Sequence, residues 1–158
     1  MMRTSTADHE AAHAAAAIMA GCRVVEVRVG GLDDGSRGAV RFRRGPLNRM
    51  HVTIYLAGGL VARVEGATDY PEWPPTFPVL PGRGDQGDVH DAVKTLGLDA
   101  EDYADVVRAA KALVATQEFR YLALVLSAAC NASEPRTLSE ERVEQLAGHD
   151  LIERYARS

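Results

Sequence analysis

The stretch from Thr4 to Ala20 constrains the fold of this 158-residue chain more than any other segment. It is rich in alanine and contains neither glycine nor proline, and alanine has the highest intrinsic helix propensity of all residues. Ser5 or Thr6 can cap the start of a helix here, and Gly21 can end it. The sequence therefore predicts a helix over this stretch.

Two short strands are predicted after this helix. Apolar and charged residues alternate through the second half of Arg23–Val29, and they alternate again over Gly38–Arg43. Such alternation is typical of a half-buried strand. Because a cluster of turn-forming residues at 30–36 separates the two segments, we expect them to form an antiparallel hairpin.

Helices are predicted over most of the remaining chain. Residues 48–64 are apolar over much of the helix surface, which indicates a central helix. The Gly58-Gly59 pair weakens that helix, so we expect another backbone to approach it closely there. Further helices are expected from Asp88 to 96, from a cap within 99–102 to about 114, over 118–130, and from a capping box at 137–140 to 146.

The fold class predicted from these elements is α+β, mainly helical with a small antiparallel hairpin or sheet. The length suits a single domain spanning residues 1–158. Residues 70–81 hold five of the seven prolines, which predicts a stiff, extended connection. Its aromatic residues either line a substrate wall or pack on the core.

Composition excludes several classes of protein. The net charge of -4 and a pI near 5.7 argue against a nucleic-acid binder, which is usually basic. No run approaches the ~20 apolar residues that a membrane span needs. The two cysteines, Cys22 and Cys130, are too few for a disulfide framework and fit a reducing compartment. We therefore expect a cytoplasmic protein without a membrane span, and we expect both thiols to be small apolar packing residues.

The strongest chemical signal is the sequence His9-Glu10-Ala11-Ala12-His13, an H-E-x-x-H motif. Residues four apart share one face of a helix, so both imidazoles can bind one Zn²⁺. Glu10 follows the first histidine directly, where its carboxylate can take a proton from a water that the metal activates. The motif predicts a zinc site with His9 and His13 as ligands and Glu10 as the catalytic base.

A hydrolytic zinc site holds three protein ligands and keeps one position open. The pattern alone leaves the third ligand undecided, and Asp88 is equally well suited to cap a helix over 89–96. The candidates are His51, Glu65, Asp69, Asp85, Asp88, His90 and Asp91.

The motif and its surroundings resemble the peptidase domain of FtsH-type ATP-dependent zinc proteases. Residues 6–14 are similar to the active-site helix of that family, and residues 55–62 to its Gly-Gly helix. Residues 84–92 look like the segment that supplies the family's aspartate ligand, and the resemblance places this ligand at Asp88. Residues 121–129 and 137–139 are similar to its closing helices. The resemblance implies a zincin-like core and covers most of the chain.

The chain also departs from the family pattern. The family usually has Gly at the position of Ala12, Arg at that of Leu60 and Asn at that of Gly87. These differences affect the residues that surround and support the metal site more than the metal ligands themselves. The segment contains no ATPase domain, so we expect it to act without hydrolysing ATP. A homo-oligomer and a separate ATPase partner both remain open.

The function predicted is that of a zinc metallopeptidase that hydrolyses peptides or unfolded protein segments. The alternative is a catalytically silent relative that serves as an interaction or regulatory module, although such a module would not need Glu10. Arginines 37, 41, 43, 44 and 49 gather around the second strand. They either select acidic side chains of a peptide paired with that strand or form a solvated face that prevents aggregation, and we favour the solvated face.

Overall fold

A computed structural model describes residues 6–30, 38–43, 45–64, 84–132 and 136–148 of the chain. Within these ranges, the side chains of residues 59–64 and 84–87 are not described. The proline-rich segment 70–81 lies outside the described residues, so its predicted extended conformation remains a prediction.

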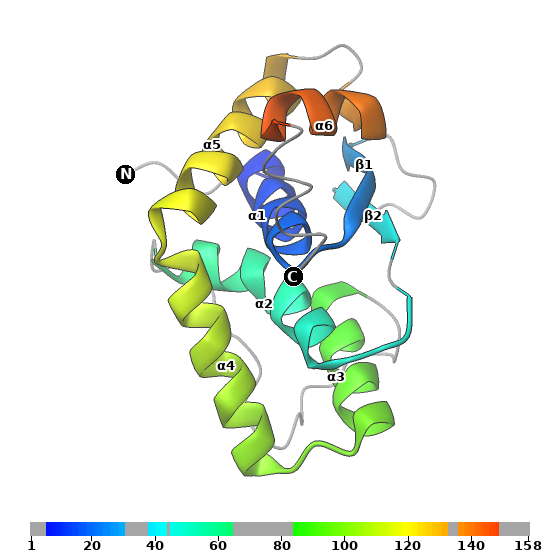
Figure 1. Cartoon of the computed structure of the whole chain (residues 1–158), viewed down its shortest axis with the longest axis vertical. Coiled ribbons are helices and arrows are strands. Elements are labelled where there is room, and N and C mark those ends of the chain that lie inside the picture. Colours follow the sequence, from blue (N-terminus) through cyan, green and yellow to red (C-terminus); the bar gives the residue numbers. More distant parts are fainter. Residues whose placement is uncertain (1–5, 31–37, 44, 65–83, 133–135, 149–158) are drawn as a thin grey trace.

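Helix α1 (Thr6–Met19) forms the centre of the molecule, and ten of its fourteen residues are buried. Its inward positions are mainly alanines, and several of these, such as Ala11 and Ala15, have no exposed surface. Small side chains allow neighbouring backbones to approach from several sides. Figure 1 accordingly shows α1 enclosed between α5 (Gln117–Ala132), α2 (Arg49–Val64) and the small sheet.

The sheet contains three antiparallel strands in the order β2-β1-β3. They are β1 (Arg23–Val29), β2 (Gly38–Arg43) and β3 (Thr137–Ser139), and Val27 of β1 pairs with Val40 of β2 and Leu138 of β3. The register shifts between Val24 and Glu26, so β1 carries a bulge there. The predicted hairpin is confirmed, and within the described residues β2 forms one edge of the sheet.

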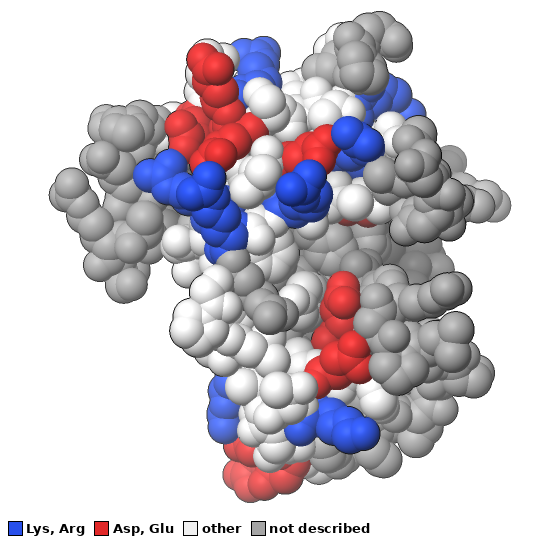
Figure 2. Space-filling model, turned by 90° about the vertical axis from the view of Figure 1, so that its right-hand side faces the viewer, with Lys and Arg blue, Asp and Glu red and all other residues white. Residues whose placement is uncertain are grey.

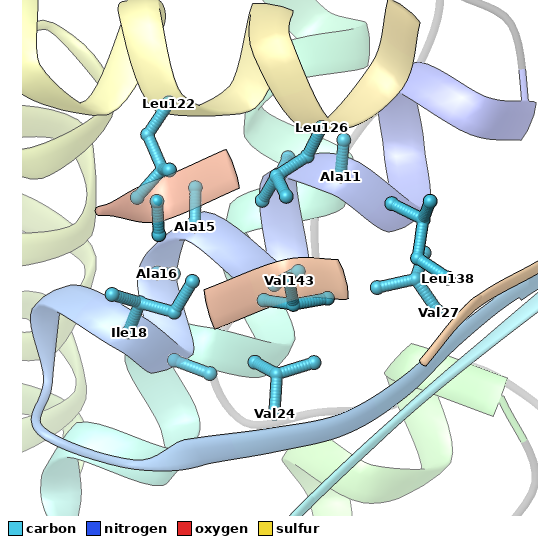
Figure 3. Packing of buried hydrophobic residues seen from close by; sticks show 14 of the residues in the cluster. Ala11, Ala15, Ala16, Ile18, Val24, Val27, Leu122, Leu126, Leu138 and Val143 are labelled. Atoms are coloured by element: carbon cyan, nitrogen blue, oxygen red, sulfur yellow. The ribbon is translucent and has the colours of Figure 1, made fainter. Parts of the chain in front are cut away.

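A hydrophobic cluster joins α1 to the sheet, to α5 and to α6 (Glu140–Ala147). Figure 3 shows Leu122 and Leu126 of α5 pointing toward the alanines of α1, while Val143 of α6 lies between α1 and β1. The full burial of Leu126 indicates that α5 packs against α1 through large side chains, which the alanines leave room for.

A second cluster lies between α2, α3 (Gly84–Leu96) and α4 (Ala100–Val114). Helix α2 contributes to both clusters. Ile54 and Ala57 belong to the first, whereas Val52 and Leu56 belong to the second. This division confirms the prediction of a central helix, because α2 is covered on two sides.

Two predicted helix starts are wrong. Helix α3 begins at Gly84, so Asp88 lies inside it and does not cap it. The predicted capping box at 137–140 is also wrong: residues 137–139 form β3, and the Ser139 hydroxyl caps α6 by accepting from the Arg142 N–H at 3.2 Å. By contrast, Asp99 and Asp102 form a capping box at the start of α4, as the sequence predicted for that region.

No single described helix combines the length and the hydropathy of a membrane span, and only the pair α4 and α5, bent by 70° at their junction, passes when taken together. The described residues are mostly helical with one small antiparallel sheet, as expected for an α+β fold.

Candidate functional site

The two histidines of the motif face one another on α1. Their Nε2 atoms lie 3.1 Å apart, and their rings meet edge to face with centroids 4.7 Å apart. His13 is 5 % exposed, whereas His9 is half-buried. The four-residue spacing on a helix accounts for this contact, because residues four apart lie one above the other. The predicted pairing of the two imidazoles is therefore present.

The main chain of α2 holds the second nitrogen of His13. Its Nδ1 lies 2.7 Å from the carbonyl oxygen of Ile54. A carbonyl oxygen only accepts hydrogen bonds, so Nδ1 must carry a proton. In the neutral imidazole the lone pair then resides on Nε2, the atom that faces His9. Hydrogen bonds of this kind fix the tautomer of histidines that bind metals.

The imidazole pair fits a zinc ion. Two nitrogens bound at the usual distances to a tetrahedral zinc are about 3.3 Å apart, close to the 3.1 Å between the Nε2 atoms of His9 and His13. The tautomer of His13 presents a lone pair on the correct nitrogen. Both the spacing and the chemistry of these two donors thus suit zinc.

Gly58 of α2 lies directly against the imidazole pair. A Cβ atom at this position would lie 2.5 Å from Nε2 of His13 and 2.7 Å from Cε1 of His9. The Gly58-Gly59 pair predicted the close approach of another backbone. The atoms nearest to the open space beside Gly58 belong to the two imidazole rings of α1.

Glu10 is buried, with 8 % of its surface exposed, and lies beside the first residue of β2. A Cβ atom at Gly38 would lie 2.7 Å from Cγ of Glu10. Burial raises the pKa of the Cys130 thiol, Arg136 opposes this rise, and the negative charge of Glu10 adds to it. Glu10 therefore lies against the edge strand and acts electrostatically on Cys130 of α5.

The described part of the chain does not complete a three-ligand site. No group of three or more His, Cys, Asp or Glu side chains is placed there to hold a metal ion. Asp88 is half-buried in α3, and this helix packs on α2. Among the described residues, Asp88 does not form a metal-binding group with His9 and His13. Asp88 as the third ligand remains a prediction, but its competing role as a helix cap is excluded.

Three other candidates lie within the described residues. Nδ1 of His51 accepts a hydrogen bond from the Asn48 N–H at 2.9 Å. A neutral His51 therefore carries its proton on Nε2, which makes that nitrogen unsuitable as a ligand. His51 is also two turns before Gly58, about 10 Å along the helix axis. Nδ1 of His90 lies 3.7 Å from the Asp91 carboxylate on the same helix.

Glu65 and Asp69 lie outside the described residues, as does the side chain of Asp85.

Sequence reasoning missed two contributions to the site. Ile54 acts through its main-chain carbonyl, which no side-chain pattern reveals. Ser127 of α5 donates its hydroxyl hydrogen to the Asp8 carboxylate and so fixes the turn of α1 that precedes His9. A buried serine on an otherwise apolar helix face is the only signal that could have indicated this contact.

The arginines near β2 form ion pairs, and Figure 2 shows basic and acidic side chains intermixed over the upper part of one face. The pairs are Arg41 with Glu26 at 3.3 Å, Arg43 with Glu140 at 3.7 Å and Arg49 with Asp102 at 2.9 Å. Arg37 and Arg44 lie outside the described residues. This mixture favours the solvated face over selection of acidic side chains.

No protein-family model, curated protein or solved structure matches this chain. The relationship to FtsH-type peptidases therefore stays a prediction, and the function has to be inferred from the imidazole pair and its surroundings.

Proposed function

We propose that the chain is a zinc-dependent metallopeptidase that cleaves peptides or unfolded protein segments. The observation that carries this proposal is the 3.1 Å approach of the Nε2 atoms of His9 and His13, with Nδ1 of His13 held by the Ile54 carbonyl. The close contact between these two imidazoles on adjacent turns is explained by a shared proton or by a shared metal ion. The motif sequence favours the metal.

Each residue of the motif has a separate role in this proposal. His9 and His13 bind the ion through Nε2, and Asp88 is the proposed third ligand. Zinc at such a site lowers the pKa of water toward ~7 and polarises a carbonyl group. Glu10 accepts the proton of the attacking water and passes it to the leaving amine.

The edge strand supports the proposed substrate class. An extended peptide can add to the free edge of a sheet through main-chain hydrogen bonds, and β2 is an edge strand of the described sheet. Its first residue, Gly38, contacts Glu10. A peptide paired with this strand would therefore pass the carboxylate that acts as the base.

Hydrolysis of a quenched fluorescent peptide library tests the proposal. Wild-type protein with zinc should cleave some members, and Glu10→Gln should lose at least about a hundredfold in kcat, as is usual for a general base. Glu141→Gln, on the exposed side of α6, is the matched control and should keep the wild-type rate. Zinc bound by both proteins, with equal and negligible turnover, would instead identify the silent interaction module.

Metal analysis tests the ligand set. The wild type should bind about one zinc per chain, and His13→Asn should abolish this binding, whereas His149→Asn should not. Asp88→Ala should weaken binding sharply. Undiminished zinc in Asp88→Ala would move the third ligand to Glu65 or Asp85.

A further inference from the structure

Two glycines on different elements each contact a different part of the motif. On α2, a Cβ at Gly58 would overlap the imidazoles of His9 and His13; on β2, a Cβ at Gly38 would overlap Cγ of Glu10. The corresponding distances, 2.5 and 2.7 Å at Gly58 and 2.7 Å at Gly38, are too short for non-bonded atoms. Any side chain at either position forces its neighbour to move.

We propose that Gly58 and Gly38 are positioning residues with separable effects: Gly58 sets the metal-binding geometry of the imidazole pair, and Gly38 sets the place of the Glu10 carboxylate. The consequences for metal affinity and turnover rest on the proposed function. The steric relation itself does not depend on it.

A methyl group at Gly58 would overlap the imidazole of His13. The closest atom is Nε2 of His13, the nitrogen proposed to bind the metal. His13 cannot easily retreat, because it is almost fully buried and its Nδ1 is hydrogen-bonded to Ile54, one helical turn before Gly58. A methyl group at Gly58 must therefore displace a ligand atom or push α2 away from α1.

A methyl group at Gly38 would overlap the side chain of Glu10. A Cβ here would also lie 3.0 Å from the carbonyl oxygen of Arg28 in the neighbouring strand. Because Gly38 pairs with Val29 in the β1–β2 ladder, the strand cannot shift without disturbing that ladder. The side chain of Glu10 has to yield, and neither imidazole is among the nearest atoms.

A purely structural role for the two glycines predicts a different outcome. If they only permit close packing, Gly58→Ala and Gly38→Ala should both lower stability without separating metal affinity from turnover. Leu56→Ala provides the matched control, since Leu56 is buried on α2 but belongs to the second cluster. It should destabilise α2 and leave the zinc affinity unchanged.

The first experiment measures zinc affinity by competition with a chelator, and kcat at saturating zinc. Gly58→Ala should weaken zinc binding by about 10- to 100-fold, as expected when the support of a metal ligand is lost. Gly38→Ala should keep zinc affinity within about twofold and lower kcat by about a hundredfold or more, as expected for a displaced general base. Wild-type zinc affinity in Gly58→Ala, or wild-type kcat in Gly38→Ala, would overturn the proposal.

The second experiment requires neither zinc nor activity. Stability is measured by urea unfolding of the metal-free protein for Gly58→Ala alone and for Gly58→Ala combined with His9→Ala and His13→Ala. The destabilisation caused by Gly58→Ala should disappear once the rings are removed, and the same should hold for Gly38→Ala combined with Glu10→Ala. Equal destabilisation in both backgrounds would overturn the proposal, and so would a Gly58→Ala variant that fails to fold and stays unfolded when His9→Ala and His13→Ala are added.

The two experiments separate the proposals from each other. A wild-type protein that binds no zinc would refute the proposed function, and the unfolding cycles would still decide whether the glycines position the motif.

Discussion

Ala12 occupies the position of the H-E-x-x-H motif at which FtsH-type peptidases usually carry glycine, and this difference can be tested. The residue lies in the middle of α1 and has no exposed surface. In a helix interior, glycine is about 1 kcal/mol less favourable than alanine. Removal of the buried methyl group forfeits a further ~0.8 kcal/mol. We therefore expect Ala12→Gly to lower the free energy of unfolding by roughly 2 kcal/mol.

Urea unfolding followed by circular dichroism measures this loss. With a slope of about 2 kcal/mol per molar urea, the midpoint should fall by about 1 M. Ala109→Gly is the matched control, because Ala109 lies in the interior of α4 but is exposed. It loses only the helix propensity, so its midpoint should fall by about 0.5 M.

The difference between the two variants isolates the contribution of burial. If Ala12→Gly costs no more than Ala109→Gly, the reasoning that α1 is stabilised by its buried methyl groups is refuted. Zinc affinity should be unchanged in Ala12→Gly, because Ala12 is not a ligand.

Three further predictions concern the surroundings of the site. Ser127→Ala removes the donor to the Asp8 carboxylate and should cost roughly 1–2 kcal/mol; a double-mutant cycle with Asp8→Asn should return a coupling energy of similar size, and zero coupling would contradict it. The backbone N–H of Asp99 and, to a lesser extent, Arg49 hold the pKa of Asp102 below its ordinary 3.8, so its contribution to stability is complete above that pH and is lost as the pH falls through the lowered pKa. Asp102→Asn should therefore flatten the pH dependence of the unfolding midpoint below about pH 4, and an unchanged profile would refute this. Chelation of zinc should lower the thermal midpoint, because a ligand at 100 times its Kd contributes about 2.7 kcal/mol; a midpoint that does not respond to chelator would show that the folded chain does not bind the metal.

Local patterns predicted most of the elements correctly. The alanine-rich helix, the two alternating strands and the helix 49–64 all appear with bounds within two residues of those expected. In each case the pattern extends over several residues and reflects burial against a neighbour. The imidazole pair was predictable for the same reason, since a spacing of four positions on a helix determines which side chains meet.

Features that depend on contacts far apart in the sequence were not predictable. Strand β3 has only three residues and exists because Leu138 pairs with Val27, more than a hundred positions earlier. The start of α3 at Gly84 was missed because glycines and acidic residues resemble a turn when they are read locally. The Ile54 carbonyl and the contact of Gly38 with Glu10 follow from how α2 and β2 lie against α1, and no local pattern encodes that.

Helix α2 separates the two hydrophobic clusters and contributes side chains to both. Its Ile54 carbonyl and Gly58 touch the histidines from one side, while Val52 and Leu56 are anchored between α3 and α4 on the other. A small rotation of α2 about its own axis would therefore move both clusters at once. Such a shift would carry the groups that contact the two histidines along with the side chains that fill the second cluster.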